Sequence, residues 1–233
     1  MIITLDGPAG AGKSTIARLL GERLGIPVIY SGLFYRALAS YLIQKSRGSP
    51  LSSLPSTSSA STPPHLEDIP AIKNVEIKRD GSVSVEGIEV TPLLRTLKVD
   101  ELSFRISQTK PVREKVAELI KESTLNLPSF VAEGRDMGSV VFKEAEIKVY
   151  LKASLSERAR RRYLEIIRER CVSFEEVFEE IKRRDEEDSR RQLSPLTIPP
   201  GAYCIDTSGM DIEEVVEYIL SLIPRTLPGG FIS

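Results

Sequence analysis

The feature that most constrains the fold is a glycine-rich segment, GPAGAGKS at residues 7–14, which matches G-x-x-x-x-G-K-[ST] completely. An apolar run at residues 2–5 precedes it and predicts a buried strand. Residues 15–24 follow it with helical spacing of apolar side chains, and Gly25 ends that pattern. A strand, a glycine-rich turn and a helix in this order predict an α/β fold with a parallel sheet covered by helices.

The same segment predicts a triphosphate site. Gly7, Gly10 and Gly12 allow backbone conformations that are closed to residues with a Cβ, so successive N–H groups can turn inward onto a phosphate. The helix that follows adds the positive end of its dipole. We expect Lys13 to reach the β- and γ-phosphates and the Ser14 hydroxyl to bind Mg²⁺. The predicted ATP-binding residues are Gly7, Pro8, Ala9, Gly10, Ala11, Gly12, Lys13, Ser14 and Thr15.

Composition excludes several classes of protein. The 32 Lys and Arg residues nearly balance the 33 Asp and Glu residues, which argues against binding polymeric nucleic acid by bulk positive charge. No run approaches the ~18 apolar residues of a membrane span, and no signal peptide is visible, so we expect a cytoplasmic protein. Cys171 and Cys204 form no CxxC pair, and His65 is the single histidine, which argues against a metal knuckle or a histidine-based triad.

The rest of the chain continues the α/β pattern with one interruption. Further strands are predicted at residues 26–30, 130–132, 147–151 and 203–206, and further helices at 32–44, 97–108, 111–125 and 211–222. Alternating apolar residues within 73–91 predict a small three-stranded antiparallel insert. Twelve of the twenty residues in 46–65 are Ser or Pro, which predicts a loosely packed linker. Residues 156–191 carry 11 basic and 11 acidic residues, and we expect two projecting helices, with most of these charges in ordinary i,i+4 pairs.

A second group of residues suggests an acceptor site. Ser31 and Arg36 lie at a strand-to-helix junction, and Arg135 and Asp136 follow the carboxyl end of another predicted strand, the edge where open α/β sheets bind ligands. Glu133 at the end of that strand is the nearest candidate for a metal-facing acid. The absence of an N-K-x-D element argues against guanine-specific switch GTPases, and the chain length suits a small kinase that closes over two substrates.

Several motifs occur in a fixed order. They are Asp6–Thr15, Ser31-Gly-x-x-Tyr-Arg36, Arg95–Thr96, Pro111-Val-Arg113, Glu133–Gly138 with Val140–Phe142, Ser156–Arg162, and Arg184-Asp…Asp188-Ser-Arg-Arg191 followed by Ser194-Pro-Leu196. Together they resemble bacterial-type cytidylate kinases, a nucleoside monophosphate kinase family of P-loop proteins, from residue 1 to about 222.

This resemblance implies a P-loop three-layer fold with a central five-stranded parallel sheet, a small antiparallel β insert and a helical lid. The implied divisions are a P-loop core at 1–45, 97–153 and 192–223, a Ser/Pro-rich linker at 46–65, an inserted CMP-side subdomain at 66–96, an arginine-rich helical lid at 154–191, and a tail at 224–233.

The resemblance also implies an activity. The family transfers the γ-phosphoryl group of ATP to CMP or dCMP, giving ADP and CDP or dCDP, with Mg²⁺, by in-line transfer within a closing two-substrate cleft. The partners implied are these small molecules, with neither a membrane nor nucleic acid, and we expect a monomer.

Site residues follow from the resemblance position by position. The residues implied to form hydrogen bonds with the cytosine base are Ser31, Arg113 and Asp136. Those for the CMP phosphate are Arg36, Arg135 and Arg191, and those for the ribose are Arg184 and Asp188. The implied catalytic residues are Lys13, Arg158, Arg162 and Arg135.

Some alternatives stay open at this stage. Ser31 can also cap a helix, Arg184–Asp188 can be a surface pair, and Arg158 or Arg162 can pair with Glu157 or Glu165.

The sequence departs from the family at Phe104, where most members carry a small residue facing the base. Either Ser103 supplies that contact or the contact is absent.

The alternative functions are a P-loop kinase for UMP or for a small alcohol, with Asp136 as the base, and a non-catalytic nucleotide-binding module. Intact Lys13 and Ser14, together with the arginine set, argue against the non-catalytic module.

Overall fold

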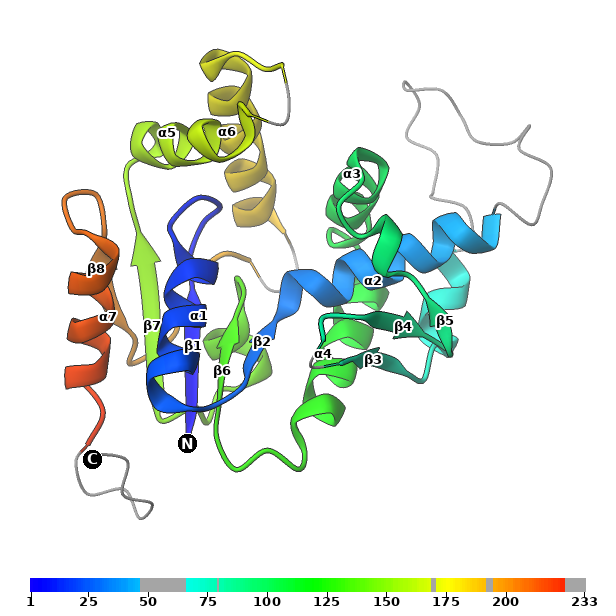
Figure 1. Ribbon diagram of the computed structural model, residues 1–233, viewed down its shortest axis with the longest axis horizontal. Helices are drawn as coiled ribbons and strands as arrows, with labels where there is room; N and C mark the ends of the chain where they lie inside the picture. The colour runs from blue at the N-terminus through cyan, green and yellow to red at the C-terminus, as the bar shows by residue number, and fades with distance from the viewer. Residues whose placement is uncertain (47–65, 79, 169–170, 192–194, 225–233) are drawn as a thin grey trace. The chain divides into compact units, whose positions relative to one another are not determined.

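The computed structural model describes residues 1–46, 66–78, 80–168, 171–191 and 195–224 (Figure 1). The chain forms two compact units, which we call the sheet unit, Met1–Tyr30 with Leu127–Ser233, and the insert unit, Ser31–Asn126. The predicted linker after residue 46 and the predicted tail after residue 224 lie outside the described residues, as does the start of the predicted core segment at 192–194.

A five-stranded parallel sheet forms the centre of the sheet unit. Its spatial order is β2-β6-β1-β7-β8, and every neighbouring pair is parallel. The strands are β1 (Ile2–Asp6), β2 (Val28–Tyr30), β6 (Phe130–Glu133), β7 (Ile147–Lys152) and β8 (Tyr203–Asp206). All five strands were expected from the apolar runs, and the predicted α/β fold with a five-stranded parallel sheet is confirmed. β1 is the central strand of this sheet, and its residues Ile3 and Leu5 have no exposed surface.

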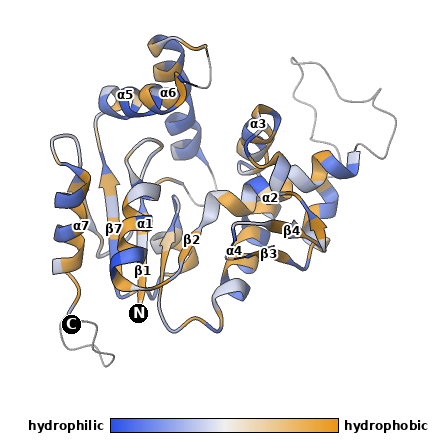
Figure 2. Ribbon diagram, viewed as in Figure 1, coloured by the Kyte–Doolittle hydropathy of each residue, from blue (hydrophilic) through white to orange (hydrophobic). Residues whose placement is uncertain are grey.

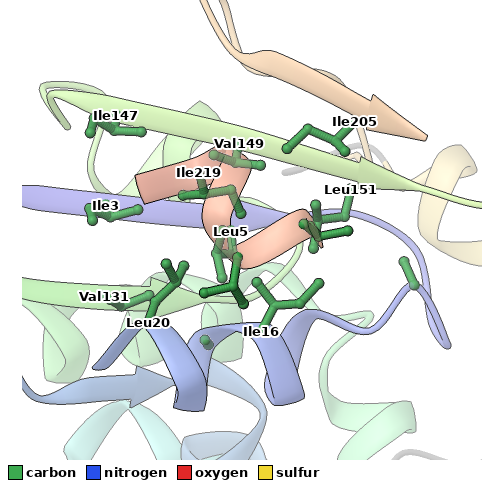
Figure 3. Close-up of a cluster of buried hydrophobic side chains, with 14 residues drawn as sticks. Ile3, Leu5, Ile16, Leu20, Val131, Ile147, Val149, Leu151, Ile205 and Ile219 are labelled. Atoms are coloured by element: carbon green, nitrogen blue, oxygen red, sulfur yellow. The ribbon is translucent and has the colours of Figure 1, made fainter. Parts of the chain in front are cut away.

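Helices α1 (Lys13–Leu24) and α7 (Ile212–Ser221) pack against this sheet and against each other. Figure 3 shows Ile16 and Leu20 of α1 and Ile219 of α7 directed at the side chains of the central strands, and all three are almost completely buried. Gly25 ends α1 in a left-handed conformation, with its N–H bonded to the carbonyl of Gly21. Asp211 and Glu214 form a capping box at the start of α7.

Two charged helices follow β7, as the composition of residues 156–191 predicts. They are α5 (Leu155–Ile166) and α6 (Phe174–Arg190), and Figure 2 shows long hydrophilic stretches on α6. A small apolar cluster that includes Ala159, Ile166, Val177 and Ile181 joins them. Outside this small cluster, the charged side chains of the two helices form ion pairs, for example Arg183 with Glu187 at 3.0 Å.

The insert unit contains a three-stranded antiparallel sheet in the order β3-β4-β5, as predicted. Glu86 and Gly87 connect its last two strands, and both have positive φ angles, which is the backbone that a two-residue hairpin requires. The strands are β3 (Val75–Ile77), β4 (Val83–Val85) and β5 (Ile88–Glu89). The helices of this unit are α2 (Ser31–Ser46), α3 (Leu97–Ile106) and α4 (Lys110–Thr124), with 3₁₀ turns η2 (Leu66–Ala71) and η3 (Thr91–Leu93).

The units divide the chain differently from the sequence-based domains. The prediction placed residues 31–45 and 97–126 with the P-loop core, whereas α2 contacts α3, α4 and β4 and belongs to the insert unit. The buried side chains Phe34, Leu38 and Ile106 lie on these helices. Helical periodicity identifies the apolar face of a helix, but it does not identify the element that covers that face.

Within the described residues, we find no helix with the combined length and apolar content needed to cross a bilayer.

The fold makes a stability prediction in the core of the sheet unit. Leu20 is fully buried, so Leu20→Ala should lower the free energy of unfolding by about 2–5 kcal/mol, through lost burial and the cavity left behind. Leu164 on α5 is 54% exposed, and Leu164→Ala should change that free energy by less than about 0.5 kcal/mol. Urea unfolding monitored by circular dichroism measures both, and equal losses for the two variants would contradict the assignment of the core.

Candidate active site

The glycine-rich segment forms a tight loop between β1 and α1. Gly7, Gly10 and Gly12 have φ angles of 144°, 76° and 86°, so the prediction that these glycines adopt conformations closed to other residues is confirmed. A Cβ at Gly7 would lie 2.1 Å from the carbonyl oxygen of Leu151 in β7. Gly12 precedes α1 without a side-chain cap, so the first N–H groups of α1 are left for an anion or for water.

Lys13 lies buried beneath this loop. Its Nζ donates a hydrogen bond to the carbonyl of Pro8 at 2.8 Å and lies 3.9 Å from Oε1 of Glu133. Burial lowers the pKa of Lys13 to about 8, and the nearby Glu133 carboxylate opposes this change. A bound polyphosphate would favour the charged ammonium and so raise the pKa of Lys13 again.

Ser14 and Glu133 provide oxygen atoms beside Lys13. The Ser14 hydroxyl donates to Oε2 of Glu133 at 3.3 Å, and burial raises the pKa of the Glu133 carboxyl, while the Lys13 charge lowers it. A hydroxyl and a carboxylate are hard oxygen donors and suit Mg²⁺. The described residues contain no cluster of three or more His, Cys, Asp or Glu side chains that could hold a metal ion.

A second charged cluster lies in the sheet unit. Asp188 of α6 is fully buried, with Oδ2 at 2.8 Å from Nε of Arg135 and Oδ1 at 2.8 Å from Nη2 of Arg191. The structure therefore brings these three sequence-predicted residues together. Two guanidinium groups share one carboxylate, which leaves one net positive charge and favours an anion. Arg184 instead forms an ion pair with Glu180 on its own helix.

Arg158 of α5 lies directly against the glycine-rich loop. Its Nη1 donates to the carbonyl of Ala9 at 3.0 Å and forms an ion pair with Asp185 at 2.6 Å. A Cβ at Gly10 would lie 2.8 Å from the Arg158 carbonyl oxygen, so helix and loop are in close contact. Burial raises the pKa of the Asp185 carboxyl, and Arg158 opposes this. Asp185 is part of the quoted Arg184-Asp…Asp188 motif, but sequence reasoning gave it no role.

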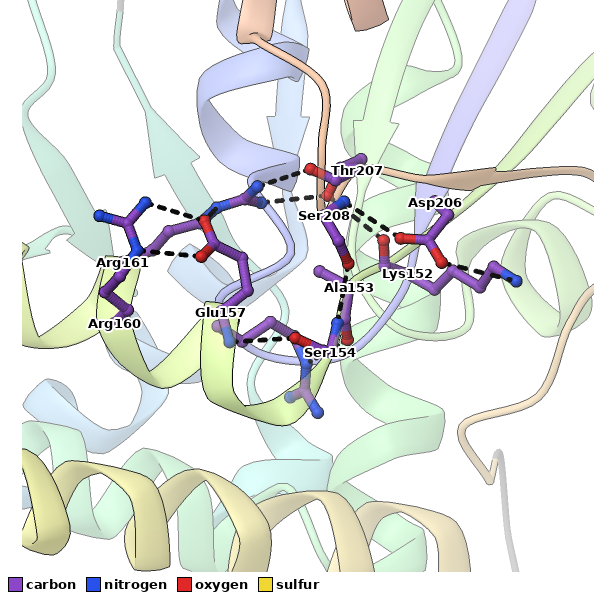
Figure 4. Close-up of polar contacts among 10 residues, drawn as sticks. Lys152, Ala153, Ser154, Glu157, Arg160, Arg161, Asp206, Thr207 and Ser208 are labelled. Atoms are coloured by element: carbon purple, nitrogen blue, oxygen red, sulfur yellow. Dashed lines mark hydrogen bonds and ion pairs between the residues drawn. The ribbon is translucent and has the colours of Figure 1, made fainter.

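Arg162, the second predicted lid residue, pairs with Glu165 at 2.9 Å. Its neighbour Arg161 lies close to the loop, and a Cβ at Gly12 would be 4.0 Å from Nη1 of Arg161. The Arg161 guanidinium donates to Oγ1 and to the carbonyl of Thr207, and its Nε donates to Glu157 at 2.8 Å (Figure 4). In the sequence, Arg161 and Glu157 have the spacing of an ordinary i,i+4 pair, so the contact of Arg161 with Thr207 was not predicted.

Three of the predicted site residues lie in the insert unit. Ser31 is the first residue of α2 and is buried. Arg36 pairs with Asp100 and donates to the carbonyl of Leu94 at 2.9 Å. Arg113 is buried, donates to the carbonyl of Ser107 at 3.1 Å, and lies 5.8 Å from the ring centre of Tyr35.

Ser103 and Phe104 lie on α3 of the insert unit. The sequence left open whether Ser103 supplies the base contact that Phe104 cannot make. The Ser103 hydroxyl donates to the carbonyl of Asp100 on its own helix at 3.0 Å, and Phe104 is half-buried.

Asp6 ends β1 and is fully buried. Its Oδ1 accepts the N–H of Met137 at 2.8 Å, and its Oδ2 accepts the N–H of Gly138 at 2.7 Å. Burial raises the pKa of Asp6 to about 7, and the two N–H bonds oppose this. The titratable groups that interact with it are Asp136, Lys13 and Tyr150.

The family model and the curated relatives point to the same family. The family model described as "Cytidylate kinase" matches residues 3–225. A cytidylate kinase of Carboxydothermus hydrogenoformans is 39% identical, with 97% of this chain and 98% of the relative covered. A cytidylate kinase of Caldanaerobacter subterraneus subsp. tengcongensis is 38% identical, with 97% and 96% covered. Among solved structures, a shikimate kinase from Acinetobacter baumannii in complex with shikimate aligns with a TM-score of 0.42 and 20% identity, over 95% of this chain and 91% of that one.

The raised pKa of Asp6 predicts a pH dependence of stability. The pKa of the folded carboxyl lies near 7, whereas its ordinary value is 3.8, so the free energy of unfolding should fall as the pH rises between these values. Asp6→Asn removes this component. The stability of the natural chain relative to the variant should therefore decline across that range in urea unfolding.

Glu157→Gln is the control for this measurement. The hydrogen bond from Arg160 lowers the pKa of Glu157 to about 2, so its contribution is constant above about pH 5. A pH-independent difference between the natural chain and Asp6→Asn would contradict the prediction.

Proposed function

Because the chain belongs to the cytidylate kinase family and is therefore a nucleoside monophosphate kinase, we propose that it transfers the γ-phosphoryl group of ATP to CMP and dCMP. The products are ADP and CDP or dCDP. The observation that carries the proposal is that one unit holds two clusters of cationic side chains, Lys13 with the glycine-rich loop and Arg135 with Asp188 and Arg191. Both Arg135 and Asp188 act electrostatically on Lys13, so the two clusters are close enough to influence each other. A module that only binds ATP has no need of the second cluster.

On the ATP side, the backbone N–H groups of residues 7–15 bind the phosphates and Lys13 supplies a charge to the transferred group. Arg158 and Arg162 are the lid arginines of the proposal. The contact of Arg158 with Ala9 supports its role, since a short movement of its side chain away from Asp185 would direct the guanidinium at a phosphate in the loop.

The Ser14 hydroxyl, with Glu133 beside it, would hold Mg²⁺ that arrives with ATP. When bound, the ion supplies charge neutralisation for the β- and γ-phosphate oxygens.

On the acceptor side, the proposal keeps the roles inferred from sequence. The phosphate of CMP binds Arg36, Arg135 and Arg191, the base contacts Ser31, Arg113 and Asp136, and the ribose contacts Arg184 and Asp188. The buried pairing of Asp188 with Arg135 and Arg191 supports this, because a carboxylate of this kind holds two guanidinium groups ready for a phosphate.

The reaction requires little covalent work from the chain. A phosphate oxygen of CMP attacks the γ-phosphorus in line, the bond to the β–γ bridging oxygen breaks, and ADP leaves with that electron pair. The attacking oxygen is already anionic, so no general base is needed. Lys13 and the arginines stabilise the charge of the transferred group, and α5 and α6 exclude the water that would otherwise hydrolyse ATP. The monomeric state, the cytoplasmic location and the lid role of residues 154–191 stay predictions.

The proposal is tested by measuring ADP release with each possible acceptor. We expect turnover with CMP and dCMP to exceed that with UMP, AMP and a shikimate-like alcohol, and ATP without acceptor to give almost no ADP. Lys13→Ala should lower turnover by at least about a hundredfold, because the charge on the transferred group is lost. Lys121→Ala, at an exposed position of α4, is the control.

Three outcomes of this assay would contradict the proposal. Equal ADP release without CMP points to simple hydrolysis. Turnover with the alcohol favours the alternative kinase, and ATP binding without any turnover favours a non-catalytic module.

Asp136 makes a separate prediction about selectivity. A carboxylate accepts from the amino group of cytosine but faces a carbonyl in uracil, so Asp136→Ala should lower the ratio of kcat/KM for CMP over UMP by about ten- to a hundredfold. Asp136→Asn should lower the same ratio while keeping more activity toward UMP, because an amide can also donate. Steady-state kinetics with both nucleotides measure this, and an unchanged ratio in both variants would remove Asp136 from the base site.

A further inference from the structure

Two consecutive residues of β1 hold both ends of the short loop that carries Arg135 and Asp136. At the start of the loop, the N–H of Gly134 donates to the carbonyl of Leu5 at 3.0 Å, which continues the pairing of β6 with β1. At its end, the N–H groups of Met137 and Gly138 donate to the Asp6 carboxylate. The backbone of residues 134–136 is therefore fixed at both ends by the same strand.

The segment after the loop is an unusual helix that needs support from outside. Residues Met137–Val141 form a π-helix, η4, in which Val141 and Phe142 donate to the carbonyls of Asp136 and Met137. The first N–H groups of any helix have no partner within it, and a π-helix is rare because its geometry is less favourable. Asp136, the residue before η4, makes no capping bond with its side chain. The carboxylate of Asp6, 131 residues away in the chain, takes that part.

Gly138 allows this contact. A Cβ at this position would lie 2.6 Å from Oγ1 of Thr4 and 3.2 Å from Oδ2 of Asp6, so any larger residue would push η4 away from β1. Oγ1 of Thr4 is buried and has no hydrogen-bond partner among the described residues. Thr4 therefore contributes close packing at this point and no polar bond.

We propose that Asp6 is a positioning residue for the acceptor nucleotide: by binding the first two N–H groups of η4, it holds Arg135 and Asp136 at the carboxyl edge of the sheet. This rests on the proposed function in one respect, that Arg135 and Asp136 contact CMP. Asp6 directly precedes Gly7 in the sequence, and its place there suggests a role in ATP binding. The geometry points to the other substrate, because both hydrogen bonds of the carboxylate go to η4.

Aspartate suits this task better than its amide. A carboxyl group offers two acceptor oxygens, and here each receives one N–H group. Asparagine would offer one acceptor and would direct an NH₂ group at the second N–H, so Asp6→Asn breaks one of the two bonds with almost no change of volume.

The test compares two variants that weaken the same contact from its two sides. Asp6→Asn changes the acceptor on β1, and Gly138→Ala adds a methyl group on η4 that pushes η4 away from β1. For both variants we expect the KM for CMP to rise about tenfold, while the Kd for ATP, measured without CMP, changes less than twofold. Thr4→Ala combined with Gly138→Ala removes the nearest clashing atom and should recover part of the KM. Asp211→Asn is the control, because it makes the same chemical change at the cap of α7 and should leave both constants unchanged.

Hydrogen exchange by mass spectrometry separates this inference from the proposed function. Peptides that cover residues 134–142 should exchange faster in Asp6→Asn and in Gly138→Ala than in the natural chain, whichever acceptor the enzyme uses. Where another acceptor gives the highest turnover, the proposed function fails and the KM for that acceptor is measured instead. Unchanged exchange, an acceptor KM within twofold of the natural chain, or a parallel loss of ATP affinity would each overturn the assignment of Asp6.

Discussion

The parallel pairing of β1 between β6 and β7 is the constraint on which the site depends. It places the carboxyl ends of three strands at one edge, and each strand is followed by a different segment of the proposed site: the glycine-rich loop after β1, the loop with Arg135 and Asp136 after β6, and α5 after β7. Close contacts link the glycine-rich loop to β7 and to α5, and link β1 to η4. A Cβ at Gly7 would collide with β7, Arg158 donates to Ala9, and Asp6 binds the backbone of η4. The proposed sites for the triphosphate and for the acceptor phosphate therefore lie at the same carboxyl edge of the sheet.

Buried and partly buried arginines in this unit are balanced by carboxylates from α6. Asp185 pairs with Arg158, and Asp188 pairs with Arg135 and Arg191. A guanidinium group buried without a partner would cost several kcal/mol, so these aspartates allow the charged side chains to remain inside the folded protein before any nucleotide binds. A phosphate that approaches them competes with a carboxylate for donors that are already oriented, and this reduces the entropy lost on binding. Both aspartates lie on α6, so a ligand that displaced them from their arginines would remove contacts that hold this helix.

Local patterns were sufficient to predict much of the fold. The spacing of Gly7, Gly10, Gly12 and Lys13 encodes the loop by itself, since left-handed backbone and a helix start are properties of a few neighbouring residues. The five parallel strands and the antiparallel insert also follow from apolar runs and turn residues. The assignment of α2 to the insert unit did not follow, nor did the pairing of Asp185 with Arg158, because both depend on tertiary neighbours that no local pattern specifies. Asp6 shows the same limit: in the sequence it belongs to the glycine-rich motif, and its two bonds go to residues 131 and 132 positions away.

The segment from Glu133 to Gly138 combines several constraints in six residues. Glu133 is buried beside Lys13 and Ser14, and Arg135 pairs with Asp188. Gly138 lies so close to Thr4 that a Cβ there would clash with its hydroxyl. A β-strand directs successive side chains to opposite faces, so residues that serve different partners can be adjacent only where the strand ends and the backbone turns. The turn must then be held as firmly as a strand, because a shift of about 1 Å can cost a hundredfold in rate. The carbonyl of Leu5 and the carboxylate of Asp6 supply that support from β1, so the two loops that are proposed to hold the two substrates share one strand as their common origin.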